Sequence, residues 1–188
     1  YQQPRGIHLI TEFNNEPMVH SALALKEKGA VFSLEPLINH RTWKNRDEII
    51  SLLRYADTAS PDWPSASGIA GSDDPLKVLK HWSKLGPSLV TVRHGAQGSY
   101  VWDNVTDCMW HIPAVPTAVV DPTGAGNCYG GGAFVGWVEH RDGRIAATYG
   151  GVSAVFLVRR YGLPPMTKEL QQEAQQLLEQ ALDRSEKL

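Results

Sequence analysis

The stretch that decides the fold is Asp121-Pro122-Thr123-Gly124-Ala125-Gly126-Asn127. Glycines on both sides of Ala125 let the backbone turn sharply and bring several N–H groups close to an anion. The following residues, Cys128 to Glu139, are typical of a helix, so Gly126 and Asn127 should lie in its first turn. Unpaired N–H groups and the positive end of the helix dipole favour a phosphate there. The stretch therefore predicts either an anion-binding loop or a tight strand-to-helix turn.

The residues around this loop carry a resemblance to a known family. The pattern Asp-x-Thr-Gly-Ala-Gly, a polar residue and then Gly130-Gly131 resembles the second signature of the ribokinase-like, or PfkB, carbohydrate kinases. The resemblance implies that Gly124, Ala125 and Gly126 form an anion hole for the transferring phosphate. It also implies that Asn127 occupies the position of the family's catalytic base, an aspartate that takes the proton from the acceptor hydroxyl.

The resemblance continues on the N-terminal side of the loop. The run Val31-Phe32-Ser33-Leu34-Glu35-Pro36, followed by Arg41-Thr42-Trp43, looks like the family's strand that ends in an acidic residue and a proline. The pair Ala56-Asp57 and the later Pro61-Asp62 resemble a segment in which the family has an asparagine and a glutamate that organise magnesium and phosphate. Here Asp62 replaces the asparagine and Ser65 replaces the glutamate.

A nucleotide-binding segment is the third point of similarity. Residues 91–98, Thr-Val-Arg-His-Gly-Ala-Gln-Gly, are similar to the family's Thr-x-Gly-x-x-Gly pattern, with Arg93 where a threonine is usual. The resemblance implies ATP with Mg²⁺ as cofactor, and nucleotide contacts from Thr123, Arg93, Gly95 and Gly98.

Three of these residues also have a structural interpretation. Asp121 is either an oxygen ligand near a monovalent cation, as the resemblance implies, or a turn aspartate that bonds its own backbone. Arg93 either clamps phosphates bidentately or forms a surface ion pair. Thr123 either bonds phosphate or stabilises the turn.

Asn127 limits the chemistry that the loop can perform. An amide has no basic lone pair at neutral pH, so it can orient a hydroxyl but cannot accept its proton. Loss of a general base typically costs about 10²–10⁴-fold in rate, but phosphoryl transfer depends mostly on positioning and electrostatic stabilisation. Three alternatives stay open: a weakened kinase of a sugar or similar small alcohol, a pseudokinase that serves as an interaction or structural subunit, and an engineered aspartate-to-asparagine variant.

Composition indicates one ribokinase-like α/β domain over residues 1–188. The chain is 42% hydrophobic, with Gly and Pro scattered rather than in tracts. A net charge of −2 with dispersed Lys and Arg gives no sign of a nucleic-acid partner. No apolar run approaches the roughly 20 residues that span a bilayer, so no membrane partner is expected. Two cysteines, Cys108 and Cys128, favour an intracellular, reducing compartment.

The order of predicted elements alternates between strands and helices, which favours a three-layer α/β/α fold with a mostly parallel sheet. Strands are expected over residues 6–11, 30–34, 57–59 and 88–93, and an antiparallel hairpin over 99–103 and 108–112. Helices are expected over residues 16–28, 45–55, 73–85, 128–139, 145–160 and 167–184. Two of these helices have predicted N-caps: Asn45, with Glu48 completing a capping box, and Thr167.

This order matches the C-terminal part of the ribokinase-like fold, whose members are longer on the N-terminal side. The resemblance therefore implies that the N-terminal part, with most of the sugar pocket and its lid, is missing. In a complete chain, the strand over residues 6–11 is expected to be a sheet edge that a protein partner covers.

Overall fold

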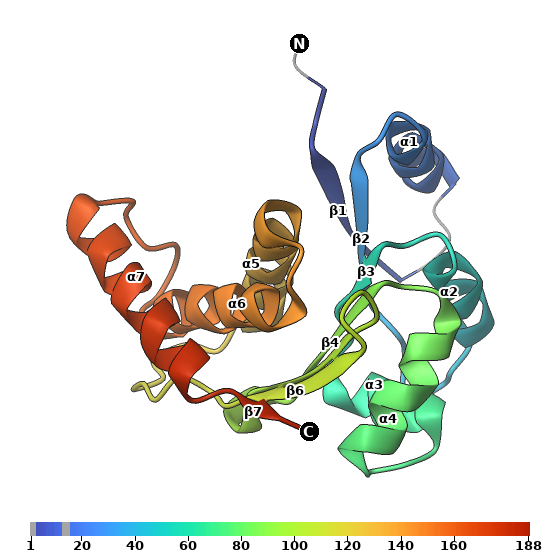
Figure 1. Ribbon diagram of the computed structural model, residues 1–188. Helices are drawn as coiled ribbons and strands as arrows, with labels where there is room; N and C mark the ends of the chain where they lie inside the picture. Colours follow the sequence, from blue (N-terminus) through green and yellow to red (C-terminus); the bar gives the residue numbers. More distant parts are fainter. Residues whose placement is uncertain (1–2, 13–15) are drawn as a thin grey trace.

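A single twisted sheet organises the protein, and the computed structural model describes residues 3–12 and 16–188 around it (Figure 1). Within those residues the sheet has seven strands in chain order. They are β1 (Gly6–Thr11), β2 (Val31–Pro36), β3 (Thr58–Ala59), β4 (Leu89–Arg93), β5 (Ser99–Asp103), β6 (Cys108–Ile112) and β7 (Glu186–Lys187). Strands β1 to β4 pair in parallel, and the pairings from β4 to β7 are antiparallel. The predicted parallel sheet and its hairpin are confirmed.

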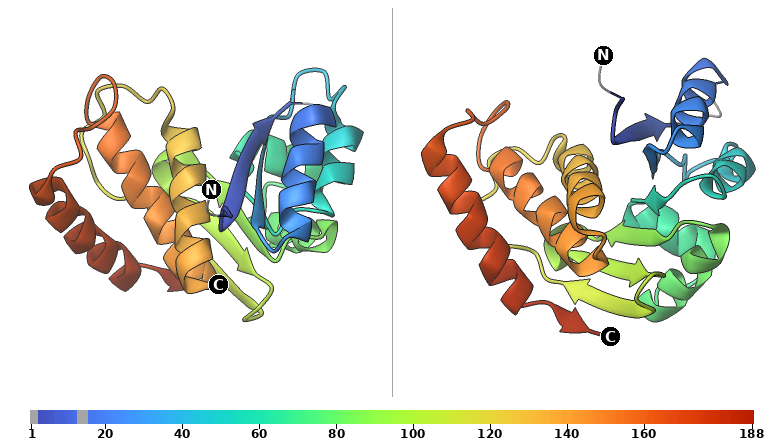
Figure 2. Two further views of the ribbon diagram at one scale, coloured as in Figure 1. Left: turned by 90° about the horizontal axis from the view of Figure 1, so that it is seen from above. Right: turned by 45° about the horizontal axis from the view of Figure 1, so that its top comes forward.

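Helices cover both faces of this sheet (Figure 2). One layer holds α1 (Glu16–Glu27), α2 (Arg46–Leu53), α3 (Trp63–Ala70) and α4 (Pro75–Trp82). The other layer holds α5 (Ala125–His140), α6 (Gly143–Val158) and α7 (Lys168–Asp183). Short 3₁₀ turns lie at Ser83–Leu85 and Gly95–Gln97. None of the helices described is long and apolar enough to cross a membrane.

Strand β2 joins the two halves of the core. All six of its residues are buried, as expected for a central parallel strand covered on both faces. Because successive side chains alternate between faces, Phe32 and Leu34 pack toward the layer of α1 to α4, whereas Val31 packs toward α5 and α6. Burial on both faces fixes the position of β2, and with it the position of Glu35 near its end.

Helix caps show where local prediction succeeded and where it was wrong. Thr167 caps α7 as predicted, since its side chain accepts the N–H of Leu170 at 3.2 Å. The capping box at Asn45 was wrong, although α2 does begin directly after that residue. The Asn45 side chain instead accepts the N–H of Asn39 at 3.1 Å and donates to the Leu37 carbonyl at 2.8 Å. It braces the preceding connection, which only the tertiary structure brings within reach.

Two elements were not predicted. Helix α3 contains proline, two serines and a glycine, all weak helix formers, so its sequence gave little helical signal. It is stabilised at its start by Asp62, whose carboxylate accepts the N–H of Ser65 at 3.1 Å. Strand β7 is only two residues long and forms because the chain end pairs with β6.

Candidate active site

The loop before α5 has the geometry expected of an anion-binding turn. Gly124 has φ +81°, a left-handed conformation that favours glycine, and α5 starts at the next residue. No side chain caps this helix, so the N–H groups of its first turn have no side-chain acceptor. Asn127 lies in that first turn and is exposed. The helix starts three residues before the predicted range of 128–139, and Gly126 and Asn127 lie in its first turn as expected.

Asp121 adopts the turn geometry. Its carboxylate accepts the backbone N–H of Thr123 at 2.9 Å, and this hydrogen bond lowers the pKa of Asp121 below its ordinary value. Thr123 itself is exposed. The role of Asp121 near a monovalent cation and the phosphate contact of Thr123 stay predictions.

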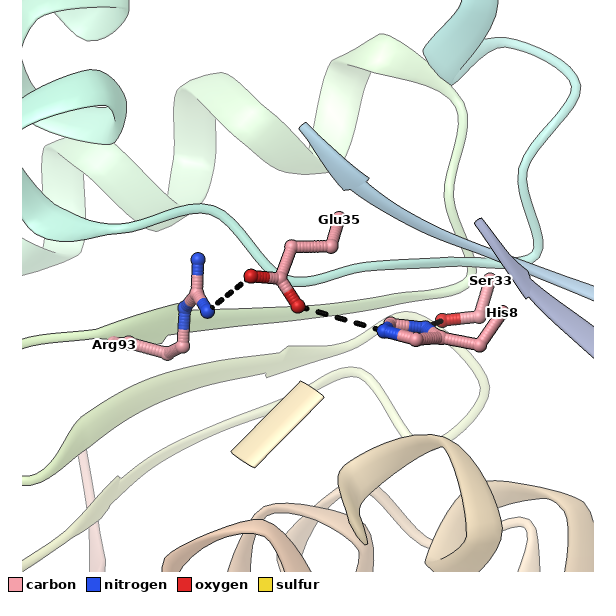
Figure 3. Close-up of polar contacts among 4 residues, drawn as sticks. All are labelled: His8, Ser33, Glu35 and Arg93. Atoms are coloured by element: carbon pink, nitrogen blue, oxygen red, sulfur yellow. Dashed lines mark hydrogen bonds and ion pairs between the residues drawn. The ribbon is translucent and has the colours of Figure 1, made fainter. Parts of the chain in front are cut away.

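Arg93 is brought against this loop from the end of β4. A Cβ atom added to Gly126 would lie only 2.6 Å from Nη1 of Arg93, so the guanidinium rests directly on the helix backbone. The same Nη1 donates to Oε1 of Glu35 at 2.6 Å (Figure 3). Side-chain exposure is 12% for Arg93 and 1% for Glu35. Arg93 is thus in an ion pair, but a buried one beside the loop and not one on the surface.

Glu35 is also held on its other side. Its Oε2 lies 3.4 Å from Nε2 of His8, and Nδ1 of His8 is 2.9 Å from the hydroxyl of Ser33 (Figure 3). A Cβ at Gly130 would be 2.4 Å from the same Oε2. Gly126 and Gly130 are four residues apart, on one face of α5. This bare face allows the helix to pack onto the Glu35–Arg93 pair.

The electrostatics of Glu35 follow from these contacts. Burial alone would raise its pKa, but the His8 contact and the positive charge of Arg93 outweigh that effect and lower the pKa below the ordinary value. Glu35 is therefore a carboxylate at neutral pH. Three buried atoms of the cluster, His8 Nε2, Glu35 Oε2 and Arg93 Nε, have no hydrogen-bond partner among the described residues. The cluster therefore has three buried polar atoms next to the loop whose hydrogen bonds are not satisfied by the described residues.

Sequence reasoning did not assign a role to His8 or Glu35. Glu35 had one available signal, an acidic residue at the end of a strand that is otherwise apolar apart from Ser33. A buried carboxylate of this kind needs a cationic partner. The partner could not be identified because Arg93 is 58 residues away in the chain.

Gly95 and Gly98 shape the turn that directly follows Arg93. Both have positive φ, at +55° and +92°, and a Cβ at Gly98 would lie 2.0 Å from the Ile112 carbonyl oxygen. Beside this turn, His94 stacks on Trp63 with ring centroids 4.1 Å apart. The turn is thereby fixed at the same end of β4 as Arg93, while the nucleotide contacts assigned to its glycines stay predictions.

Asp62 and Ser65 occupy the two positions that the resemblance links to magnesium. The Asp62 carboxylate caps α3, and the buried hydroxyl of Ser65 has no hydrogen-bond partner among the described residues. Those residues also contain no group of three His, Cys, Asp or Glu side chains that could hold a metal. Among the described residues, these two positions therefore form no protein cage for a metal ion.

Solved structures share this architecture. A putative ribokinase II from E. coli, crystallised with ATP and Mg²⁺, superposes with a TM-score of 0.73 at 22% identity, covering 94% of this chain and 59% of that one. Fructokinase from Vibrio cholerae O395, bound to fructose, ADP and calcium, gives a TM-score of 0.72 at 18% identity, covering 95% of this chain and 62% of that one. The fold is that of the ribokinase-like α/β kinases, as predicted.

Sequence comparison places the chain within a family. It belongs to the pfkB family of carbohydrate kinases, whose profile matches residues 6–169. Cytidine kinase of Thermococcus kodakarensis is 28% identical over 120 residues, 62% of this chain and 42% of the relative. Fructokinase of Klebsiella pneumoniae is 30% identical over 122 residues, 62% of this chain and 39% of the relative. The chain thus matches less than half the length of these relatives.

Proposed function

We propose that this chain is an ATP-dependent phosphotransferase domain that transfers phosphate to a hydroxyl of a sugar or similar small alcohol, with Mg²⁺ as the nucleotide's metal. The observation that carries the proposal is the guanidinium of Arg93, which lies against Gly126 at the uncapped start of α5. The guanidinium, paired with Glu35, and the helix dipole converge there with the N–H groups of Gly126 and Asn127, and each of these favours phosphate. Membership of a kinase family supports the same function.

Each predicted site residue has a place in this proposal. The backbone of Gly124 to Gly126 and the side chain of Arg93 hold the transferring phosphate. Asn127, exposed in the first turn of α5, orients the acceptor hydroxyl. The remaining nucleotide contacts come from Thr123, Gly95 and Gly98, with a monovalent cation near Asp121.

The rate of this reaction depends on Asn127. Because the amide cannot take up the acceptor's proton, turnover should be about 10²–10⁴-fold below that of an enzyme with a carboxylate base. The anion hole is unaffected by this change, so nucleotide binding should persist. Magnesium, when bound, would neutralise part of the phosphate charge.

The test is restoration of the base. Asn127→Asp should raise ATP-dependent phosphorylation at least about 10²-fold with some member of a panel of sugars and nucleosides. Asn104→Asp, which adds the same charge at an exposed turn, should leave turnover unchanged. If Asn127→Asp gives no gain with any acceptor, loss of the base is not what limits this protein.

A second candidate function is a pseudokinase subunit of a larger assembly. It is favoured by Asn127 and by the edge of the sheet, where β1 pairs only with β2 among the described strands. Beside that edge lies a groove of about 470 Å³, lined in part by Arg5, Phe134 and Val138. In this alternative, a protein partner covers the edge by extending the sheet.

Size-exclusion chromatography with light scattering separates the two candidates. A structural subunit should elute as an oligomer or require its partner to stay soluble. A well-folded monomer that binds ATP with micromolar Kd contradicts the subunit role. In either case we propose that residues 1–188 act as one domain in a reducing intracellular compartment, consistent with the free thiols of Cys108 and Cys128.

A further inference from the structure

The cation beside the anion loop is already neutralised within the protein. Glu35 is 1% exposed and lies 2.6 Å from the Arg93 nitrogen that touches Gly126. The other oxygen of Glu35 lies against Gly130, one helical turn further along α5. A full negative charge is therefore fixed within about one helical turn of the phosphate site.

Burial and neighbouring side chains confine the carboxylate of Glu35 beside Arg93. His8 contacts Oε2 from β1 at 3.4 Å, and Ser33 contacts His8 in turn at 2.9 Å. In the β1–β2 ladder Glu35 is paired with Ile10. An incoming phosphate must therefore bind Arg93 in the presence of this carboxylate.

We propose that Glu35 is a specificity-determining residue, which sets the charge of the phosphate group that the loop accepts. By neutralising Arg93 it disfavours metal-free phosphates and leaves the magnesium complex of a nucleotide as the preferred ligand. This inference rests on the proposed function, because it assumes that the loop binds a nucleotide phosphate.

The physical reason is that repulsion grows with the charge of the ligand. Burial places Glu35 in surroundings of low effective dielectric, where charges interact more strongly than in water. Metal-free ATP carries more negative charge than its magnesium complex, so the carboxylate penalises the free nucleotide more. A carboxylate that only oriented the guanidinium would affect both ligands equally.

The experiment measures binding of the non-hydrolysable ATP analogue AMP-PNP, which carries the γ-phosphate that the loop is proposed to hold. Calorimetry is done in excess EDTA and in excess Mg²⁺, for the wild-type protein and for Glu35→Gln. The glutamine keeps the shape of the side chain and an acceptor for Arg93. Affinity for metal-free AMP-PNP should increase about tenfold, equivalent to about 1.4 kcal/mol. Affinity for magnesium–AMP-PNP should increase about threefold or less. Asp57→Asn, which removes the carboxylate that pairs with Lys26 at 2.5 Å before β3, should change neither affinity.

A second pair of variants keeps the inference testable if Glu35→Gln does not fold. In Arg93→Met the carboxylate has lost its cation, so metal-free AMP-PNP should bind at least tenfold more weakly than to wild type. The double variant Glu35→Gln/Arg93→Met should recover at least tenfold over Arg93→Met in EDTA, and less in Mg²⁺.

Two results overturn the inference. Equal changes for the two ligands, or weaker binding of metal-free AMP-PNP to Glu35→Gln, show that Glu35 only orients or stabilises Arg93. In both cases wild-type binding stands, so the proposed function survives. If no protein in the series binds AMP-PNP under either condition, the proposed function fails and this inference fails with it.

Discussion

Gly126 and Gly130 are the two residues through which α5 contacts the Glu35–Arg93 pair. A side chain at either position would collide with this pair, at 2.6 Å from Arg93 or 2.4 Å from Glu35. The glycines therefore matter here for close approach, since both lie within a helix, where glycine costs roughly 1 kcal/mol relative to alanine. That cost is offset by bringing the start of a helix onto a buried cation.

Gly126→Ala tests this close approach. The added methyl group should displace Arg93 from the loop and weaken binding of the ATP analogue AMP-PNP about tenfold. Stability should change by less than about 1 kcal/mol, because the gain in helix propensity offsets the collision. The control is Gly131→Ala, where an added Cβ meets nothing within 4 Å. It should stabilise the protein by up to about 1 kcal/mol and leave binding unchanged, as measured by calorimetry and urea unfolding.

The lowered pKa of Glu35 predicts how stability depends on pH. The folded protein holds Glu35 ionised below its ordinary pKa of 4.5, so the unfolded chain binds more protons in that range. The stabilisation is therefore present above about pH 4.5 and is lost as pH falls through the lowered pKa. In urea unfolding at a series of pH values, the stability advantage of wild type over Glu35→Gln should shrink below about pH 4.5. A constant difference down to about pH 3 would contradict this prediction.

At the scale of elements, α5 packs closely against α6. A Cβ at Gly136 of α5 would lie 2.9 Å from the Cα of Ala146 in α6, and a Cβ at Gly150 would lie 2.9 Å from the ring of Tyr129. Small residues let the helices approach closely, and the buried tyrosine, with its pKa raised to about 12 by burial, fills the space beside them. This packing positions the first turn of α5 over β2 and β4.

Gly136→Ala should disturb that packing. The methyl group would press on backbone that cannot rotate away, which typically costs about 1–3 kcal/mol and outweighs the gain in helix propensity. We expect a net loss of about 1 kcal/mol in urea unfolding. Gly151→Ala is the matched control on α6, since an added Cβ there meets nothing within 4 Å, and it should be neutral or stabilising. If Gly136→Ala and Gly151→Ala changed the free energy of unfolding equally, helix propensity and not the contact between α5 and α6 would explain the effect.

At the scale of the whole molecule, helices cover both faces of the sheet, and among the described strands β1 and the two-residue β7 form its edges. Strand β1 pairs with β2 on one side, and no described strand pairs with its other side. Figure 2 shows β1 at the margin of the sheet, close to the N-terminal end of the described chain. Edge strands leave alternate backbone groups free for pairing with other polypeptides.

Hydrogen exchange of the chain by itself should reveal this edge. Alternate amides of β1 that point away from β2 should exchange at least about tenfold faster than the amides of β2 and β4, which are paired on both sides. The measurement is amide exchange followed by NMR at neutral pH. Uniform protection along β1 would show that a second polypeptide, including another copy of the chain, already covers the edge.

Much of the fold could be predicted because its signals are local. Apolar runs and their punctuation located the strands of the parallel sheet, and Thr167 located the start of α7 from a single capping side chain. Helix α3 was missed because its proline, serines and glycine mask the helix that Asp62 caps. The predicted capping box at Asn45 was wrong because a polar side chain can form hydrogen bonds with several neighbouring groups. The sequence does not show which of these groups it will bond.

The sequence by itself determined the glycine-flanked turn from Asp121 to Asn127 and the amide in place of a base, because these depend on residue type and short spacing. Only the tertiary structure decided that Arg93 rests on Gly126 and pairs with a buried Glu35, braced by His8. His8, Glu35 and Arg93 come from β1, β2 and β4. Only the register of the parallel sheet and the packing of α5 bring them together. The interaction between the charges of Glu35 and Arg93 depends on the distance between them. The folded structure sets that distance, so the sequence alone does not determine the electrostatics of this site.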